Sequence, residues 1–365
     1  MKLVCSKCGR SVDTTERASK CNCGGLWDLE FRPLPFRTEE IDQDEWSMFR
    51  YRKYMALDDD ESWRSVSLGE GMTPVIRLDD QVLLKMDYFM PTLSFKDRGA
   101  AALIAHCRSI GVREVVQDSS GNAGNAVAAY CARAGIRCEI FVPEGTSPKK
   151  IDMIRAHGAV CTVVPGTRDH CAEVCREKVE KDGVYYANHV YNPFFYEGTK
   201  TYIYEVYEQL HRIPENLVIP VGNGTLFLGA VYALEHLLAS GCIGKMPQII
   251  ALQSQSCDPL LRAANAGRDV PSEVTPSPTI AEGIAIGKPM RGEEILRLCK
   301  KYGVRFVHAP EDQILAARAE LAAKGIYCEH TTAANYAAYR YYCELYGGTP
   351  DCLVTMCGAG LKSDH

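Results

Sequence analysis

Residues 91–99 read PTLSFKDRG and place Lys96 shortly after an apolar strand pattern, at the start of an expected helix. A lysine there meets the partial positive charge of the helix N-terminus, which helps to depress its pKa. A lowered pKa favours the neutral amine that a nucleophilic lysine needs. The position would equally suit a surface lysine paired with Asp97. Lys96 is therefore a candidate nucleophile, and only the rest of the chain can decide between this role and that of a surface lysine.

Short apolar runs and helical patterns alternate along most of the sequence. Strands are expected at 82–86, 114–117, 138–142, 160–164, 217–221, 248–253 and 352–356. Helices are expected after Ser94, whose side chain is predicted to cap the helix, and at 122–134, 148–157, 197–212, 225–239, 310–324 and 331–346. This alternation predicts an α/β fold with parallel sheets flanked by helices. Ligands in such folds bind in loops beyond the carboxyl ends of the strands.

Three further loops of this kind have an unusual composition. Residues 118–125 (DSSGNAGN) lead into a helix and offer backbone N–H groups suited to a carboxylate. Residues 220–225 (PVGNGT) could wrap a phosphate, and residues 356–362 (MCGAGLK) offer one small polar side chain, Cys357. Alone, each loop could be an ordinary helix start or strand exit. Together with Lys96 they supply what a phosphorylated aldehyde cofactor and an amino acid would need.

The first 30 residues form a separate pattern built on four cysteines. Cys5 and Cys8 are separated by two residues, and Cys21 and Cys23 precede two glycines. Two such tight turns can present four thiolates to a structural zinc, as in a zinc ribbon. The alternative is a degenerate ribbon that holds no metal.

The composition narrows the class of protein. The chain has 365 residues, a net charge of −5, 46% hydrophobic and 24% charged residues, which suits two soluble domains without a basic surface for nucleic acid. No signal-peptide pattern and no membrane-spanning run are visible, so a cytoplasmic protein without a membrane partner is expected. The 17 cysteines lie mostly in apolar segments and are interpreted as reduced, buried side chains.

These motifs resemble those of fold-type II pyridoxal-phosphate (PLP) enzymes, and within them the threonine synthase-like group. The resemblance rests on SFKDRG (94–99), SGN (120–122), PVGN (220–223) and GAGLK (358–362), together with the cysteine pattern. It implies a tryptophan synthase β-like architecture. The predicted parts are a zinc-ribbon-like unit at 1–30, a linker at 31–65, a large PLP-binding domain at 66–100 and 197–365, and a small α/β domain at 101–196.

The resemblance also implies a role for each matching residue. Lys96 would carry the cofactor as a Schiff base and move the Cα proton, with Phe95 and Asn122 contacting the cofactor. The phosphate would be held by the loop of Gly222, Asn223, Gly224 and Thr225, and Cys357 would stand beside the pyridine nitrogen as a neutral partner. The substrate carboxylate would be bound by Ser94, Ser119, Ser120 and Gly121.

The substrate side departs from threonine synthase. Residues 192–198 read NPFFYEG, and Phe195 stands where threonine synthases carry an arginine that helps to hold the substrate phosphate. Residues 279–285 and the Ser-Ser-Gly loop look more like serine/threonine dehydratases. The leading hypothesis is therefore a lyase or replacement enzyme acting on an unphosphorylated amino acid, of the ammonia-lyase type. The alternative is threonine synthase acting on O-phosphohomoserine, with the phosphate held by Lys200 or Lys362.

A different class stays open as well, a non-catalytic binding protein that retains the fold. Lys96 argues against it. A homodimer is expected from the resemblance alone. His189 and His330 lie near predicted loop ends and could touch substrate, but a structural, hydrogen-bonded role is the favoured interpretation for both.

Overall fold

The computed structural model describes residues 1–58 and 60–362, and the chain divides into two compact units. The first unit comprises residues 1–34, 39–71 and 96–199; the second comprises 35–38, 72–95 and residue 200 onward. The domain boundaries expected from the sequence stay a prediction. In the described residues, no helix has the length and apolar character needed to cross a membrane.

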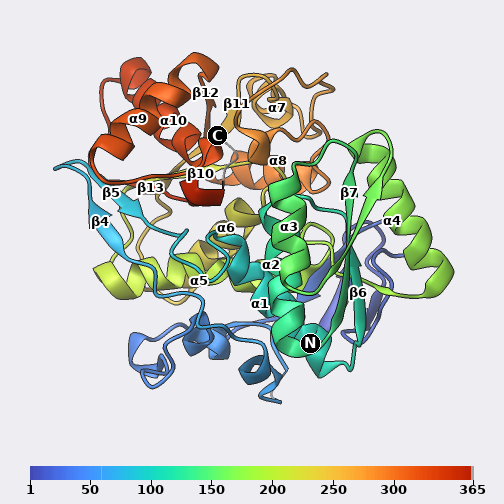
Figure 1. The fold of residues 1–365 in the computed structure, drawn as a ribbon. Coiled ribbons are helices and arrows are strands. Elements are labelled where there is room, and N and C mark those ends of the chain that lie inside the picture. The colour runs from blue at the N-terminus through green and yellow to red at the C-terminus, as the bar shows by residue number, and fades with distance from the viewer. Residues whose placement is uncertain (59, 363–365) are drawn as a thin grey trace. The chain divides into compact units, whose positions relative to one another are not determined.

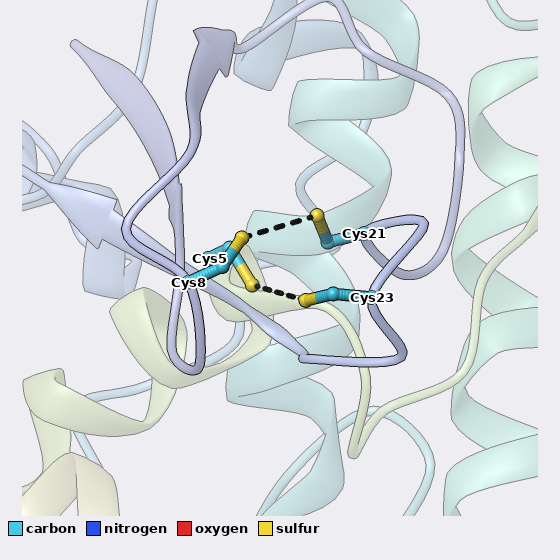
Figure 2. Close-up of side chains that lie close together, drawn as sticks. All are labelled: Cys5, Cys8, Cys21 and Cys23. Carbon is cyan, nitrogen blue, oxygen red and sulfur yellow. Dashed lines mark hydrogen bonds between the residues drawn. The ribbon is translucent and has the colours of Figure 1, made fainter.

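A small antiparallel sheet of order β2-β1-β3 forms the N-terminal part of the first unit. Its strands are β1 (Lys2–Cys5), β2 (Ser11–Asp13) and β3 (Trp27–Glu30). The four cysteines gather beside the end of β1 (Figure 2). Two of them share a buried apolar cluster with residues of the sheet and with one distant aromatic side chain: Leu3, Cys5, Cys21, Trp27 and Phe194. The N-terminal sheet thus packs against the start of helix α5 (Pro193–Leu210).

A second sheet of the first unit has four parallel strands in the order β8-β7-β6-β9, and Figure 1 labels β6 and β7. Its strands are β6 (Glu114–Gln117), β7 (Arg137–Pro143), β8 (Val160–Val164) and β9 (Tyr185–Tyr186). The helices between them and before them are α1 (Lys96–Ser109), α2 (Asn122–Ala134), α3 (Pro148–Ala156) and α4 (Arg168–Asp182).

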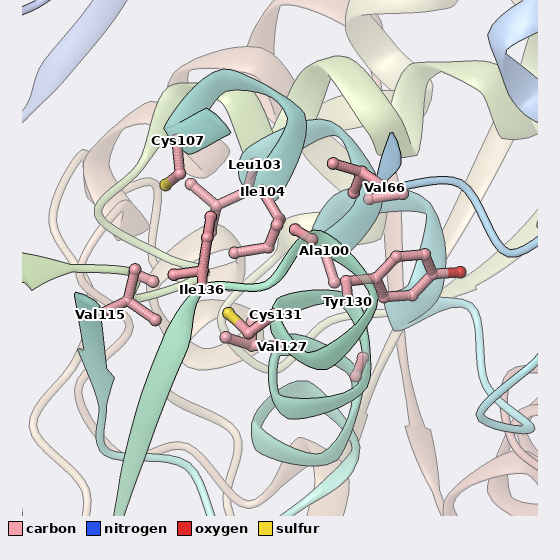
Figure 3. Close-up of a cluster of buried hydrophobic side chains, with 14 of the residues drawn as sticks. Val66, Ala100, Leu103, Ile104, Cys107, Val115, Val127, Tyr130, Cys131 and Ile136 are labelled. Atoms are coloured by element: carbon pink, nitrogen blue, oxygen red, sulfur yellow. The ribbon is translucent and has the colours of Figure 1, made fainter. Parts of the chain in front are cut away.

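The core of this unit joins α1 and α2 to the sheet (Figure 3). Leu103, Ile104, Val127 and Val115 are fully buried there, and each buried aliphatic side chain contributes roughly 1.5–3 kcal/mol to folding. Cysteines fill part of the same core, because Cys107 and Cys131 are fully buried among these residues. All 17 cysteines are free thiols, as the sequence indicated.

The segment that was expected to be a linker forms compact 3-10 turns with a buried face. Its helices include η2 (Met48–Tyr54) and η3 (Ser62–Ser65), and Phe49 stacks on Trp63 with ring centroids 5.1 Å apart. Gly71 closes the segment with a φ of +104°, and a Cβ there would lie 2.7 Å from the backbone nitrogen of Met48. The apolar residues of this former linker segment are spaced irregularly, so no helical or strand periodicity in the sequence indicates a buried face.

The second unit is built on a six-stranded sheet of order β12-β11-β10-β13-β5-β4. Its strands are β4 (Val75–Arg77), β5 (Val82–Lys85), β10 (Asn216–Pro220), β11 (Gln248–Ser254), β12 (Arg305–Ala309) and β13 (Cys352–Thr355). All neighbours pair in parallel except β4 with β5. The unit's helices are the later part of α5 (Pro193–Leu210), α6 (Thr225–Ala239), α7 (Pro259–Asn265), α8 (Gly292–Tyr302), α9 (Ile314–Ala323) and α10 (His330–Tyr346).

The predicted α/β class and every predicted strand and helix are confirmed, with ends that shift by a few residues. The sequence did not predict β1 to β4, β9, β12, α4, α7 and α8, because these elements are short or rich in charged residues. One prediction is wrong: Ser94 does not cap α1. Its Oγ is buried and has no hydrogen-bond partner in the described chain, while its backbone forms a bridge to Gly358. Helix α1 begins two residues later, at Lys96.

Candidate active site

In the first unit, Lys96 occupies the first turn of α1 and is half-buried. The next two side chains, Asp97 and Arg98, are fully buried. The Nζ atom of Lys96 lies 5.8 Å from the ring centroid of Phe195. This partial burial does not fit the alternative of a surface lysine.

Two glycines hold the start of α5 against the first turn of α1. A Cβ on Gly99 would lie 2.2 Å from ring atom Cε1 of Phe195, and a Cβ on Gly198 would lie 1.9 Å from the carbonyl oxygen of Arg98. Neither distance is possible for a real Cβ atom. Glycine at both positions therefore lets Phe195, which is fully buried, lie beside Lys96.

The loop after β6 forms a tight turn into α2. Helix α2 starts after Gly121, which has no side chain to cap the first N–H groups. A Cβ on Gly124 would lie 1.8 Å from the carbonyl oxygen of Ser119, so the loop folds back on the helix. Ser119 is buried, Ser120 and Asn122 are half-buried, and the Oδ1 of Asn125 is buried without a partner in the described residues. Backbone N–H groups at a helix N-terminus suit a carboxylate.

A second loop emerges at the same edge of this sheet, after β9. Strands β6 and β9 pair in parallel, with Val115 opposite Tyr185, so their following loops lie at the same edge. Asp118 joins the two loops: one of its oxygens accepts hydrogen bonds from the hydroxyl of Tyr186 (2.6 Å) and from Nδ2 of Asn188 (2.7 Å). The loop after β6, the candidate site for a substrate carboxylate, is thus fixed to the segment that carries His189.

His189 lies on this second loop and is almost completely buried. Its ring centroid is 5.7 Å from that of Phe195, and its Nδ1 has no hydrogen-bond partner among the described residues. Burial lowers the pKa of His189 well below its usual value, and the positive charges of Lys96 and Arg168 lower it further. The imidazole is therefore neutral at physiological pH.

In the second unit, the loop after β10 has the features of a phosphate cradle. Gly224, with a φ of +79°, precedes the 15-residue helix α6 and leaves its first turn uncapped by a side chain. A Cβ on Gly222 would lie 3.0 Å from the carbonyl oxygen of Gly283, so a larger residue would crowd the loop. Thr225 is buried and Asn223 is half-buried. A glycine-lined helix N-terminus fits the phosphate of PLP.

Two more loops of this unit leave neighbouring parallel strands, β5 and β13, at the same sheet edge as the loop after β10. The Cys357 thiol is buried and accepts a hydrogen bond from Nδ2 of Asn335 at 3.3 Å. The backbone N–H of Phe95 donates to the carbonyl oxygen of Cys357 at 2.9 Å. The residue that precedes Lys96 in the chain is therefore tied to the Cys357 loop, and the unpartnered hydroxyl of Ser94 lies at the same bridge.

The two lysines considered as alternative phosphate ligands are both buried. The Nζ of Lys362 donates a hydrogen bond to the carbonyl oxygen of Thr92 at 2.5 Å, which anchors the C-terminal loop. Lys200 lies within α5 and is 4% exposed. The hydrogen bond gives Lys362 a structural role.

The four N-terminal cysteines form a second candidate site (Figure 2). All their Sγ atoms lie within 4.8 Å of one another, with Cys5 to Cys23 at 3.4 Å and Cys8 to Cys21 at 3.7 Å. Thiolates about 2.3 Å from a tetrahedral zinc are about 3.8 Å apart, so this arrangement fits the metal.

Comparison with known proteins bears on the cofactor. Residues 66–358 match the family model described as "Pyridoxal-phosphate dependent enzyme". The chain belongs to this family. It is 29% identical over 352 residues to a threonine synthase of Methanocaldococcus jannaschii, covering 92% of this chain and 86% of the relative. It is 31% identical over 325 residues to a threonine synthase of Mycobacterium tuberculosis, covering 86% and 87%.

Solved structures support the fold. Maize serine racemase superposes with a TM-score of 0.69 at 19% identity, covering 84% of this chain and 94% of the racemase. The processed form of threonine deaminase isoform 2 from Solanum lycopersicum superposes with a TM-score of 0.68 at 23% identity, covering 84% and 88%. The resemblance to fold-type II, threonine synthase-like PLP enzymes is confirmed, and the protein is a PLP-dependent lyase.

Sequence reasoning missed part of this arrangement. For His189 the sequence left a substrate contact open but favoured a structural role, and it did not single out Asp118 and Asn188. The sequence contains little sign of this arrangement, because β9 has only two residues and it is β9 that places His189 beside the loop after β6. His330, by contrast, lies 3.0 Å from a guanidinium nitrogen of Arg318, which agrees with the structural interpretation.

Proposed function

We propose that this PLP enzyme is an ammonia-lyase-type enzyme that acts on an amino acid without a phosphate on its side chain. The observation that carries the proposal is the buried ring of Phe195, which lies beside Lys96 where threonine synthases carry an arginine. A buried phosphate dianion needs charged, bidentate donors, and an aromatic ring offers none. The neutral His189 beside it also favours an uncharged substituent.

The residues of the chain divide the work as follows. Lys96 would hold the cofactor through its amine and, when that amine is free, would take the proton from Cα. The loop of Ser119, Ser120 and Gly121 at the start of α2 orients the substrate carboxylate, and Ser94 adds a hydroxyl. PLP, when bound, withdraws electrons from Cα and so makes its proton removable. Loss of the β-substituent would leave an enamine, and its hydrolysis by one water molecule would give a keto acid and ammonia.

Other residues would hold the cofactor in place. Gly222, Asn223, Gly224 and Thr225 would bind its phosphate at the start of α6, and Asn122 would contact its ring hydroxyl. Cys357 would lie beside the pyridine nitrogen as a neutral group. A neutral partner leaves that nitrogen unprotonated, which favours elimination over transamination.

The second candidate is threonine synthase acting on O-phosphohomoserine. It is favoured by the relatives of that name, which are 29–31% identical to this chain. In that case Lys200 or Lys362 would hold the substrate phosphate, although Lys362 already donates to the carbonyl oxygen of Thr92.

A release assay on the purified, PLP-loaded enzyme separates the two. Serine, threonine, diaminopropionate, O-phosphoserine and O-phosphohomoserine would be tested in parallel for keto acid, ammonia, phosphate and threonine. Keto acid and ammonia from an unphosphorylated substrate would support the proposal. Phosphate release and threonine formation from O-phosphohomoserine alone would overturn it.

We further propose a structural zinc at Cys5, Cys8, Cys21 and Cys23, because four mutually close thiols leave no ligand position for substrate. The expected homodimer and cytoplasmic location rest on the resemblance and on composition. Light scattering and fractionation would test them.

A further inference from the structure

We propose that His189 recognises the substrate side chain, through a hydrogen bond from its imidazole to a neutral polar group on Cβ, a hydroxyl or an amine. The proposal rests on the proposed function, since it specifies the substrate class for the same site.

The position of His189 follows from the strand pairing. Parallel pairing of β6 and β9 brings the loop of Ser119–Asn122 and the loop of His189 to one edge of the sheet. The first loop is the candidate carboxylate site. A side chain on the neighbouring loop is therefore in the right region to reach the part of the substrate beyond Cα.

His189 is also held in place. The side-chain oxygen of Asn188 accepts hydrogen bonds from the backbone nitrogens of Val190 (2.8 Å) and Tyr191 (3.3 Å), and its Nδ2 donates to Asp118. These bonds brace the loop on both sides of His189. A braced side chain loses little further entropy when it binds a ligand.

The ring has an unused polar atom. Nδ1 of His189 is buried and has no partner in the described residues. Leaving a buried polar group unsatisfied is destabilising, so such a group in a native protein calls for a partner that is not part of the chain. The Phe195 ring connects His189 to the candidate catalytic lysine: its centroid lies 5.7 Å from that of the His189 ring and 5.8 Å from the Nζ atom of Lys96. A substrate bound at Lys96 is therefore a partner suited to His189.

The electrostatics define the chemical class of that partner. A neutral imidazole has one N–H donor and one acceptor nitrogen, which matches a hydroxyl or an amine. A phosphate dianion would need a cation, and the charge of Lys96 opposes protonation of His189. Amino acids of the serine, threonine or diaminopropionate kind therefore fit this site.

The test compares two ligands that differ only in the recognised group. L-Serine and L-alanine would be titrated into the PLP-loaded enzyme, and affinity would be read from the absorbance of the cofactor directly after mixing. In His189→Phe, which keeps a planar ring without nitrogen, the preference for serine over alanine should fall about tenfold, the loss of one hydrogen bond. His189→Asn, whose amide can donate and accept, should keep part of the preference.

Control variants separate recognition from structural support. His170→Leu changes an exposed histidine of α4 and should leave the ratio unchanged. A structural role predicts that both ligands weaken together, and an unchanged ratio in His189→Phe would overturn the proposal. If that variant does not fold, His189→Leu gives the same comparison. The titration measures binding and does not depend on turnover, so absence of keto acid in the wild type would refute the proposed function without deciding the role of His189.

Discussion

The ring of Phe195 lies so close to Gly99 that a Cβ on this glycine would come within 2.2 Å of ring atom Cε1. The contact joins the start of α5 to the first turn of α1, one turn of helix beyond Lys96. This contact fixes the distance between Lys96 and the Phe195 ring, which stands where threonine synthases carry an arginine. Phe195 is fully buried, so the ring cannot move into solvent to make room.

Gly99→Ala should therefore destabilise the protein by about 1–3 kcal/mol, the usual cost of inserting a methyl group into a packed core. Denaturant unfolding monitored by circular dichroism would measure the loss of free energy. Gly244→Ala is a matched control, because nothing lies within 4 Å of a Cβ there and the residue is exposed. Equal stability of the two variants would contradict the close contact.

Phe195→Arg should create affinity for phosphate in the substrate site. A guanidinium there can form charged hydrogen bonds worth about 1.5–3 kcal/mol, so inhibition by inorganic phosphate should strengthen about tenfold or more. Inhibition constants against an unphosphorylated substrate would measure the change. The uncharged control Phe195→Met should show no such gain. If both variants respond alike to phosphate, Phe195 does not line the substrate site.

The fold was largely predictable from the sequence, while the site was predictable only in part. Loops after strands 114–117 and 217–221 stood out because glycines and small polar residues gather where apolar runs end. The cap by Ser94 was wrong because its backbone pairs with Gly358, 264 positions further along the chain. The position of His189 beside the loop of Ser119 and Ser120 was not predictable for a similar reason: it comes from the pairing of β9 with β6, which no local pattern encodes.

Removal of one N-terminal thiol tests the metal site. Cys23→Ser should lose bound zinc, measured by elemental analysis, and should melt at a lower temperature, because a structural metal contributes to folding. Cys161→Ser, at a half-buried cysteine of β8 outside the cluster, should keep its zinc. A wild-type protein purified with zinc in the buffer but without bound metal would refute the site.

Glu70 predicts a pH dependence of stability. Burial raises the pKa of Glu70 from 4.5 to about 7, against hydrogen bonds from the backbone nitrogen of Leu68 and the hydroxyl of Tyr130. Between pH 4.5 and 7 the folded protein therefore binds more protons at this carboxyl than the unfolded chain, and the contribution of Glu70 to stability falls as the pH rises.

Glu70→Gln removes this titration and should gain stability relative to the wild type from pH 5 to pH 8, by up to about 3 kcal/mol. Urea unfolding at both pH values would measure the difference. Glutamine can keep the bonds from Leu68 and Tyr130 and donate to the hydroxyl of Ser67. A constant difference between the two proteins across this range would show that Glu70 does not titrate there.

Chemical trapping of the cofactor would show whether Lys96 is the residue that carries it. The PLP-loaded enzyme would be reduced with borohydride, digested and mapped by mass spectrometry, with Lys96→Ala and the exposed-lysine variant Lys181→Ala as comparisons. We expect the cofactor mass on the peptide that contains Lys96 in the wild type and in Lys181→Ala, and no specific label in Lys96→Ala. A label on another lysine, retained in Lys96→Ala, would contradict it.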